Sequence, residues 1–189
     1  MTSDPPDGQL WQQAGAGSGE AFGMLFDRHA RAVFNHCFRM TASWAAAEDL
    51  TSTVFLLAWR KRGRADLSGG SLRPWLLGVA TNAARSERRS ARRRLALLDR
   101  VPAARDTADH ADEVAGRVDD ERRMAEVLDE VARLPRGERD VLALCAWSGL
   151  SYAEAAAALG VAEASVRSRM SRARAKLRGA LQLQTEESR

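Results

Sequence analysis

Apolar residues recur every three or four positions through most of this chain, and this spacing constrains the fold more than any other feature. Such a period is typical of amphipathic α-helices, whose buried face repeats about every 3.6 residues. Glycines and prolines separate the periodic segments, because these residues end helices or begin new ones. The segments with helical spacing are 21–38, 44–62, 74–98, 119–133, 136–147, 151–159 and 163–181.

The composition favours helices over sheets. Alanine, the strongest helix former, occurs 35 times in 189 residues, whereas valine occurs 11 times and isoleucine is absent. Alanine buries little area, so small helical bundles are favoured over one deep core. The sequence therefore predicts an all-α fold of two small helical domains.

A charged stretch divides the two predicted domains. Residues 99–121 carry eight acids and three arginines and lack apolar periodicity until near their end, which is typical of a flexible linker. We expect a flexible N-terminal segment, an N-terminal helical bundle, a flexible acidic linker, a C-terminal helix-turn-helix domain and a tail. Their residue ranges are 1–17, 18–97, 98–118, 119–182 and 183–189.

Two arginine clusters concentrate the positive charge. The formal net charge is only +4, yet residues 85–94 hold six arginines and one glutamate, and residues 167–178 hold five arginines and one lysine without an acid. Positive charge gathered on two segments of an otherwise acidic chain indicates two contacts with nucleic-acid phosphates. Two solvated helix faces are the alternative that charge alone leaves open.

The second cluster lies on a helix-turn-helix pattern. Ser151 and Glu154 form a capping-box sequence before a short helix, and Gly160 marks a tight turn after it. The next helix has one apolar stripe, formed by Val166, Met170, Ala173 and Leu177. A capped helix, a glycine turn and a second amphipathic helix are typical of DNA-binding helix-turn-helix domains.

The face opposite that stripe is suited to a major groove. Small side chains let the helix approach the bases, and Ser168, Ser171 and Arg172 can hydrogen-bond base edges. Basic residues on the two flanks lie where the phosphate backbones would pass. They are Arg167, Arg174 and Arg178 on one flank, and Arg169 and Lys176 on the other. The pattern predicts specific DNA recognition by this helix.

Asn82 precedes the first arginine cluster. Its amide carries both donors and an acceptor and can bond an extruded base, while the following arginines hold the DNA backbone. A polar contact inside the bundle is the alternative for Asn82. Trp59 and Trp75 could stack on bases, although tryptophans at helical spacing are more often core residues.

The helix expected at 44–62 has an amphipathic edge. Phe55 and Leu56 lie partly off its inward stripe, next to polar side chains at 48–53. This edge is suited to a protein partner, and a simple solvated face is the alternative.

Other classes of function lack support in the sequence. No P-loop, glycine-rich nucleotide fingerprint, nucleophile elbow or CxxC pair occurs, so we expect neither catalysis nor a cofactor. His29, His36 and Cys37 are too few for a zinc site and are expected to be structural. Cys37 and Cys145 are expected to be reduced thiols. With no visible signal peptide or membrane span, the expected location is the cytoplasm.

Three blocks of the sequence resemble the bacterial extracytoplasmic-function sigma factors of the sigma-70 family. The first is AEDLTSTVFLLAW at 47–59, the second begins with RPWL at 73–76 and runs to Asn82, and the third runs from LSYAE at 150–154 to Arg178. The order of three separate motifs is far more specific than a lone helix-turn-helix. The resemblance covers residues 18–97 and 119–180.

The resemblance implies an initiation factor that binds core RNA polymerase and directs it to promoter DNA, both duplex and melted. The residues it implies for polymerase binding are Asp49, Thr53, Phe55 and Trp59. Those implied for the start-proximal promoter element are Asn82, Arg85, Arg88 and Arg89, with the loop at 63–72. Those for the upstream element are Arg167, Ser168, Ser171 and Arg172, flanked by Arg174 and Lys176. An anti-sigma protein is a further implied partner.

An autonomous helix-turn-helix regulator, whose N-terminal bundle senses a ligand or partner, is the alternative hypothesis. Promoter-directed transcripts with core polymerase would favour the sigma factor. Tight operator binding without polymerase would favour the regulator.

Overall fold

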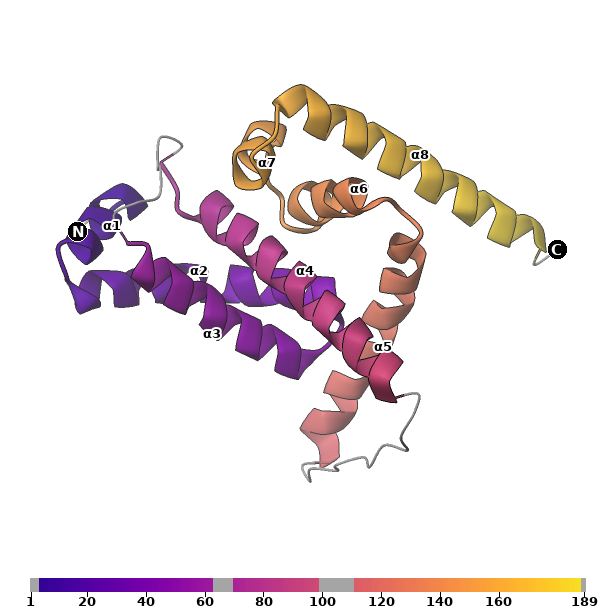
Figure 1. Cartoon of the computed structure of the whole chain (residues 1–189), viewed down its shortest axis with the longest axis horizontal. Coiled ribbons are helices and arrows are strands. Elements are labelled where there is room, and N and C mark those ends of the chain that lie inside the picture. The colour runs from indigo at the N-terminus through magenta and orange to yellow at the C-terminus, as the bar shows by residue number, and fades with distance from the viewer. Residues whose placement is uncertain (1–3, 63–69, 99–110, 188–189) are drawn as a thin grey trace.

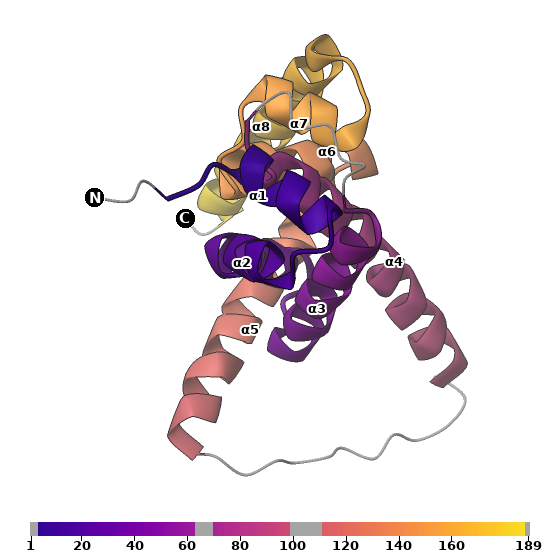
Figure 2. The same cartoon turned by 90° about the vertical axis from the view of Figure 1, so that its left-hand side faces the viewer.

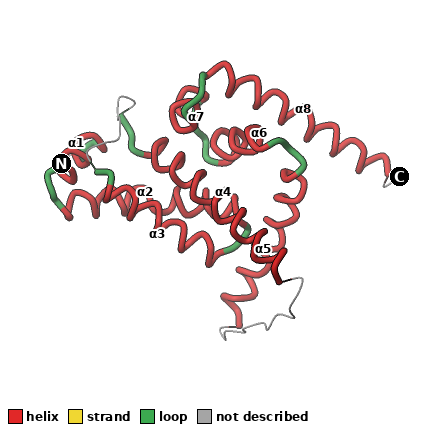
Figure 3. The backbone as a smooth tube through the Cα atoms, viewed as in Figure 1, coloured by secondary structure: helices red, strands yellow, loops and turns green. Residues whose placement is uncertain are grey.

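Every regular element in the described residues, which are 4–62, 70–98 and 111–187, is a helix (Figure 3). This computed structural model confirms the all-α prediction. The elements are α1 Asp7–Gly15, α2 Gly19–Thr41, α3 Trp44–Arg60, α4 Arg73–Leu98, α5 Ala111–Ala132, α6 Arg136–Val141, η1 Leu142–Trp147, α7 Tyr152–Leu159 and α8 Glu163–Glu187. Residues 63–69 of the predicted base-capturing loop and 99–110 of the predicted linker lie outside the described residues.

Helices α2, α3 and α4 pack against one another and form the N-terminal bundle (Figure 1). The hydroxyl of Ser18 caps α2 by accepting a hydrogen bond from the Ala21 amide, and Ser43 caps α3 in the same way. Between these helices Ala42 takes the left-handed conformation, with φ of 53°. Fully buried residues of this core include Leu25, Val33, Val54, Leu76 and Leu77.

The prediction of a flexible segment at residues 1–17 is wrong for α1. This helix packs on α2 and buries Leu10, Trp11 and Ala14. The Trp11 ring lies 5.8 Å from the Trp75 ring, between ring centroids. The sequence signal was short: the adjacent Leu10 and Trp11 indicated at most a short helical piece, which the glycines at 15–19 separate from the next segment.

Asp7 attaches α1 to the bundle. Its buried carboxylate accepts hydrogen bonds from Arg28 at 2.6 Å, from His29 at 2.8 Å and from the Leu72 amide at 2.7 Å. Burial alone would raise the pKa of Asp7, but these hydrogen bonds and the nearby positive charge outweigh it and lower the pKa. One acid thus joins the first helix to α2 and to the start of α4.

The C-terminal helices pack around α8, and their buried side chains continue the core of the N-terminal bundle. Helix α5 begins at Ala111, so residues 111–118 of the predicted linker are helical. Helix α6 continues into η1, whose wider π-helical turns end at Trp147. The buried side chains that hold α6, η1 and α8 together include Val141, Leu144, Val166 and Met170.

The two parts of the chain dock against each other, which the sequence did not indicate. Figures 1 and 2 both place α6, α7 and α8 on one side of the bundle, where α7 packs on α4 and η1 packs on α2. At Gly78 a Cβ atom would lie 2.6 Å from the Ala158 carbonyl oxygen, so only glycine permits this approach. The Trp147 carbonyl at the end of η1 accepts a hydrogen bond from Arg39 of α2.

His36 is fully buried at this contact. Its Nε2 lies 2.9 Å from the Thr81 hydroxyl and its Nδ1 lies 2.8 Å from the Ser148 hydroxyl. Because the Thr81 hydroxyl donates to the Leu77 carbonyl, it accepts from Nε2–H, and the Ser148 hydroxyl donates to Nδ1. Burial, together with the positive charge of Arg39, lowers the pKa of His36 to about 4. The ring is therefore neutral and joins the two domains as donor and acceptor.

Replacing Asp7 with Ala should lower the free energy of unfolding by about 3 kcal/mol, because the change leaves buried partners without their carboxylate. Asp4→Ala is the matched control, since Asp4 also pairs with Arg28 but its side chain is 70% exposed. We expect the control to cost less than about 1 kcal/mol. Equal losses in urea titrations of both variants would contradict the central role of Asp7.

Acidification from pH 7 to pH 5 should destabilise the docked chain by about 2 kcal/mol through His36 alone. The unfolded ring takes up a proton near its ordinary pKa of 6.5, whereas the folded ring resists protonation until about 4. The unfolded state therefore binds more protons in this window, and stability falls as pH falls. The free energy of unfolding, measured by denaturant titration at both pH values, should change less with pH for His36→Gln than for the unchanged chain. An unchanged pH dependence would show that other groups cause the loss of stability.

Candidate nucleic-acid and polymerase interfaces

Helices α7 and α8 form the helix-turn-helix that the sequence predicts. The Ser151 hydroxyl accepts from the Glu154 amide at 3.2 Å, and the Glu154 carboxylate accepts from the Ser151 amide at 2.8 Å, which completes the capping box. Gly160 ends α7 in the left-handed conformation, with φ of 64°. The buried side chains along α8 are Val166, Met170 and Ala173. The predicted apolar stripe therefore faces the core.

The opposite side of α8 is exposed and basic. The residues that the resemblance implies for the upstream element are all exposed there: Arg167, Ser168, Ser171, Arg172, Arg174 and Lys176. Arg169, predicted on one flank, is half-buried. One glutamate offsets part of the positive charge of this face, because Glu163 pairs with Arg167 at 2.9 Å. The structure thus brings the predicted base-reading and phosphate-contacting side chains onto one helix surface.

Glu138 of α6 lies beneath this surface and holds two of its cations. Its carboxylate accepts from Arg172 Nε at 3.2 Å and from Lys176 Nζ at 2.9 Å. Burial would raise the pKa of Glu138, but the two cations outweigh burial and lower it. Arg172 also donates to the Ser168 hydroxyl at 2.7 Å. Helix α6 therefore orients two side chains of α8, a role that the sequence pattern did not indicate.

The first arginine cluster is partly engaged by the second domain. Asn82 is exposed, and its amide oxygen accepts from Arg85 at 2.8 Å. Arg85 also forms a two-pronged ion pair with Asp140 of α6, in which Nε lies 2.9 Å from the carboxylate. Arg88 is half-buried and Arg89 is exposed. The arginines at 92–94 lie where side chains are not described.

The predicted polymerase-binding residues on α3 divide into two groups. Asp49 and Thr53 are exposed on one side of the helix, where they border a shallow hollow. Phe55 is instead 4% exposed and packs edge-on against Phe22 and Phe26, so the prediction that its ring lies at a partner-binding edge is wrong. Its neighbour Leu56 is 51% exposed.

Trp59 lies between the core and the surface. Its ring packs edge-on against Phe22 with centroids 5.1 Å apart, and the guanidinium of Arg62 covers it at 4.0 Å. The ring is half-buried between these two side chains.

The residues considered for metal binding have structural partners. His29 contacts Asp7 and His36 contacts two hydroxyls, while burial raises the pKa of the Cys37 thiol to about 12. Cys37 and Cys145 are free thiols. Across the described ranges no group of three metal-ligating side chains comes together, and no helix there is long and apolar enough to cross a membrane.

The sequence pattern does not reveal the roles of the two acids of α6. The stretch RGERD at 136–140 has the composition of a solvated turn, yet Glu138 and Asp140 are both buried. The available signal was two acids two residues apart, which a helix directs to roughly opposite sides, in a domain rich in arginine. Their partners lie 34 and 55 residues away, at Arg172 and Arg85, and such pairings are set by tertiary packing.

Two family models match the chain in succession. Sigma-70 region 2 matches residues 25–94, and sigma-70 region 4 matches residues 124–177, which together exceed half of the chain. This chain belongs to the sigma-70 family of RNA polymerase sigma factors. The two matches contain the α4 arginine cluster and the α8 helix-turn-helix face respectively.

Relatives of known name place this sigma factor in the extracytoplasmic-function group. It is 31% identical over 187 residues to the RNA polymerase sigma factor NccH of Alcaligenes xylosoxydans xylosoxydans, covering 96% of this chain and 98% of that protein. It is 34% identical over 174 residues to the ECF sigma factor SigL of Mycobacterium tuberculosis, covering 89% and 94%. The protein is a promoter-recognising subunit of RNA polymerase by family membership.

Two solved structures share the arrangement of this sigma factor. CnrH, solved in complex with the cytosolic domain of CnrY, superposes with a TM-score of 0.69 at 29% identity, covering 94% of this chain and 97% of that one. The sigma factor RpoE of Bartonella quintana, solved with the anti-sigma factor NepR, gives 0.61 at 26% identity, covering 85% and 96%.

Proposed function

We propose that this sigma factor binds core RNA polymerase through α3 and reads a promoter at two places, with α8 on the upstream element and α4 on the start-proximal element. The observation that carries this proposal is the exposed basic face of α8 in a capped helix-turn-helix, alongside a second arginine cluster on a separate domain. An autonomous regulator needs only the first of these surfaces, and the family match extends over both domains.

On the upstream element, Ser168, Ser171 and Arg172 would contact base edges in the major groove. Arg167, Arg174 and Lys176 would contact phosphates on either side. Glu138 supports this arrangement, because it fixes the Arg172 stem and leaves 56% of that side chain exposed. The guanidinium is thus partly preorganised before DNA arrives.

On the start-proximal element, Asn82 would bind an extruded base and the arginines of α4 would hold the strand. Strand capture of this kind offsets the cost of unstacking, a few kcal/mol per base. In the docked chain, however, Arg85 is bound to Asp140 and only 17% exposed. Promoter opening therefore requires the second domain to leave α4.

On polymerase, the exposed side chains of α3 would form the contact, namely Asp49, Thr53, Leu56 and the outer part of Trp59. Phe55 would support this surface from beneath. The sigma factor would have no catalytic activity of its own and would act in the cytoplasm, where polymerase is located.

A regulatory protein partner is part of the proposal. CnrH was solved with a domain of CnrY, and RpoE with the anti-sigma factor NepR. A similar partner would suit this chain, because a protein that stabilises the docked domains keeps Arg85 from DNA.

Run-off transcription with core polymerase on a randomised promoter library tests the proposal. Arg172→Ala should lose about 1 to 3 kcal/mol of discrimination at one upstream base, because it removes a base-edge contact. Arg174→Ala is the matched control. It should weaken binding to all promoters alike, and the dependence of log affinity on log salt concentration should fall by about one released counterion. An equal loss of transcription from every promoter variant for Arg172→Ala, or transcripts without promoter preference, would contradict base recognition by Arg172.

Asp140→Ala should strengthen binding of a short fluorescent single-stranded DNA by about tenfold, because it frees Arg85 for one charge-assisted contact. Asp120→Ala gives the same change in net charge at an exposed acid 4.0 Å from Arg123, and should change affinity little. Fluorescence anisotropy measures both. Equal gains in the two variants would indicate a general charge effect and no release of Arg85.

A further inference from the structure

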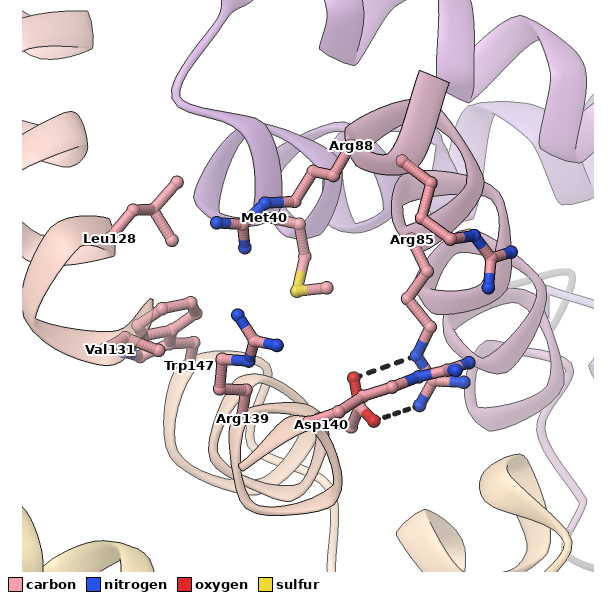
Figure 4. A pocket seen from close by; sticks show the side chains of 10 residues that line it. Met40, Arg85, Arg88, Leu128, Val131, Arg139, Asp140 and Trp147 are labelled. Carbon is pink, nitrogen blue, oxygen red and sulfur yellow. Dashed lines mark hydrogen bonds and ion pairs between the residues drawn. The ribbon is translucent and has the colours of Figure 1, made fainter. Parts of the chain in front are cut away.

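A cavity of about 100 Å³ lies between the two docked domains (Figure 4). Five arginines line it, from α4 on one side and α6 on the other: Arg85, Arg88, Arg89, Arg136 and Arg139. Its apolar wall is formed by Met40, Leu128, Val131 and Trp147. Among the described residues that line it, Asp140 supplies the one carboxylate.

The charge of the lining favours an anion. Guanidinium groups stay protonated at every physiological pH, so the lining carries five positive charges against one negative charge. Like charges gathered beside an apolar wall repel one another more strongly than they do in water, because the local dielectric constant is lower. Asp140 pairs with Arg85, and an anion bound in the cavity would add a second negative charge to this lining.

The positions of two arginines favour phosphate over a lone halide or carboxylate. Figure 4 shows the guanidinium groups of Arg88 and Arg139 reaching, from α4 and α6, toward the same space beside Met40. A planar guanidinium fork binds two oxygens of a carboxylate or a phosphate group, so two forks need about four oxygens, which a phosphate chain supplies and a lone carboxylate does not. One water needs roughly 10–15 Å³ of such space, so the cavity has room for a small polyatomic anion with more than one charged group.

We propose that this cavity binds a small oligophosphate anion, such as inorganic pyrophosphate or the phosphate chain of a nucleotide. Its arginines come from both domains, so the site is complete only when they are docked. A ligand that binds the docked form alone shifts the equilibrium toward that form. Occupancy would therefore hold α4 against α6.

A consequence for transcription rests on the proposed function. Arg88 and Arg89 would serve both the anion and the start-proximal DNA strand, so the two ligands would exclude each other. Binding of the anion does not rest on the proposed function, because it depends only on the docked arginines and can be measured without polymerase or promoter.

Isothermal titration calorimetry of the full chain with inorganic pyrophosphate tests the site. We expect saturable binding at one site per chain, weakened about tenfold or more by Arg139→Ala and by Arg88→Ala, which lie on different domains. Arg133→Ala is the control, since that side chain is 71% exposed and pairs with Glu130 away from the cavity. The absence of saturable binding, or equal affinities in all three variants, would overturn the proposal.

Two further measurements keep the result specific. Thermal unfolding of each variant establishes that it is folded, and Arg139→Lys, which keeps the charge without the planar fork, should bind more weakly than the unchanged chain. Short single-stranded DNA should lose affinity in Arg88→Ala but not in Arg139→Ala. If Arg139→Ala weakened DNA and pyrophosphate equally, the cavity would belong to the general DNA-binding surface and the proposal would be wrong.

Discussion

The docking of the second domain on α2 and α4 determines what the rest of the molecule can do. Its centre is a neutral histidine, His36, that bonds hydroxyls on both sides, and a glycine, Gly78, that lets α7 approach α4. Neither contact tolerates a larger or a charged substitute without movement of the domains. The buried side chains of the two parts form one continuous core, and we propose that this contact releases when polymerase and promoter DNA bind.

Three buried acids hold arginines in place. Asp7 anchors Arg28 in the bundle, Glu138 steadies Arg172 on the proposed reading face, and Asp140 occupies Arg85. A buried acid costs desolvation and is retained where paired cations offset that cost. Two of these pairs have opposite consequences here. The pair at Glu138 leaves its arginine oriented toward solvent, whereas the pair at Asp140 withdraws an arginine from the surface.

The sequence was sufficient to predict seven of the helices, the capping box at Ser151 and the exposed residues of α8, because these depend on local periodicity and capping. The sequence did not predict the features that depend on tertiary contacts. Helix α1 is held by Asp7 through partners at positions 28, 29 and 72, and Phe55 is covered by two phenylalanines of α2. The docking of the two domains could not be predicted either. The acidic composition of the segment between them indicated a flexible linker, and the acids of α6 resembled those of a solvated turn.

We propose that the domains of the free sigma factor are docked and that they separate on polymerase and promoter. Spin labels at two exposed positions, Glu20→Cys on α2 and Ala157→Cys on α7, in a Cys145→Ala background, would report the distance between domains by double electron–electron resonance. The account predicts one narrow, short distance in the free chain and a longer distance in the complex with core polymerase and promoter DNA. A broad, long distribution in the free chain, or the same short distance in a transcribing complex, would contradict it.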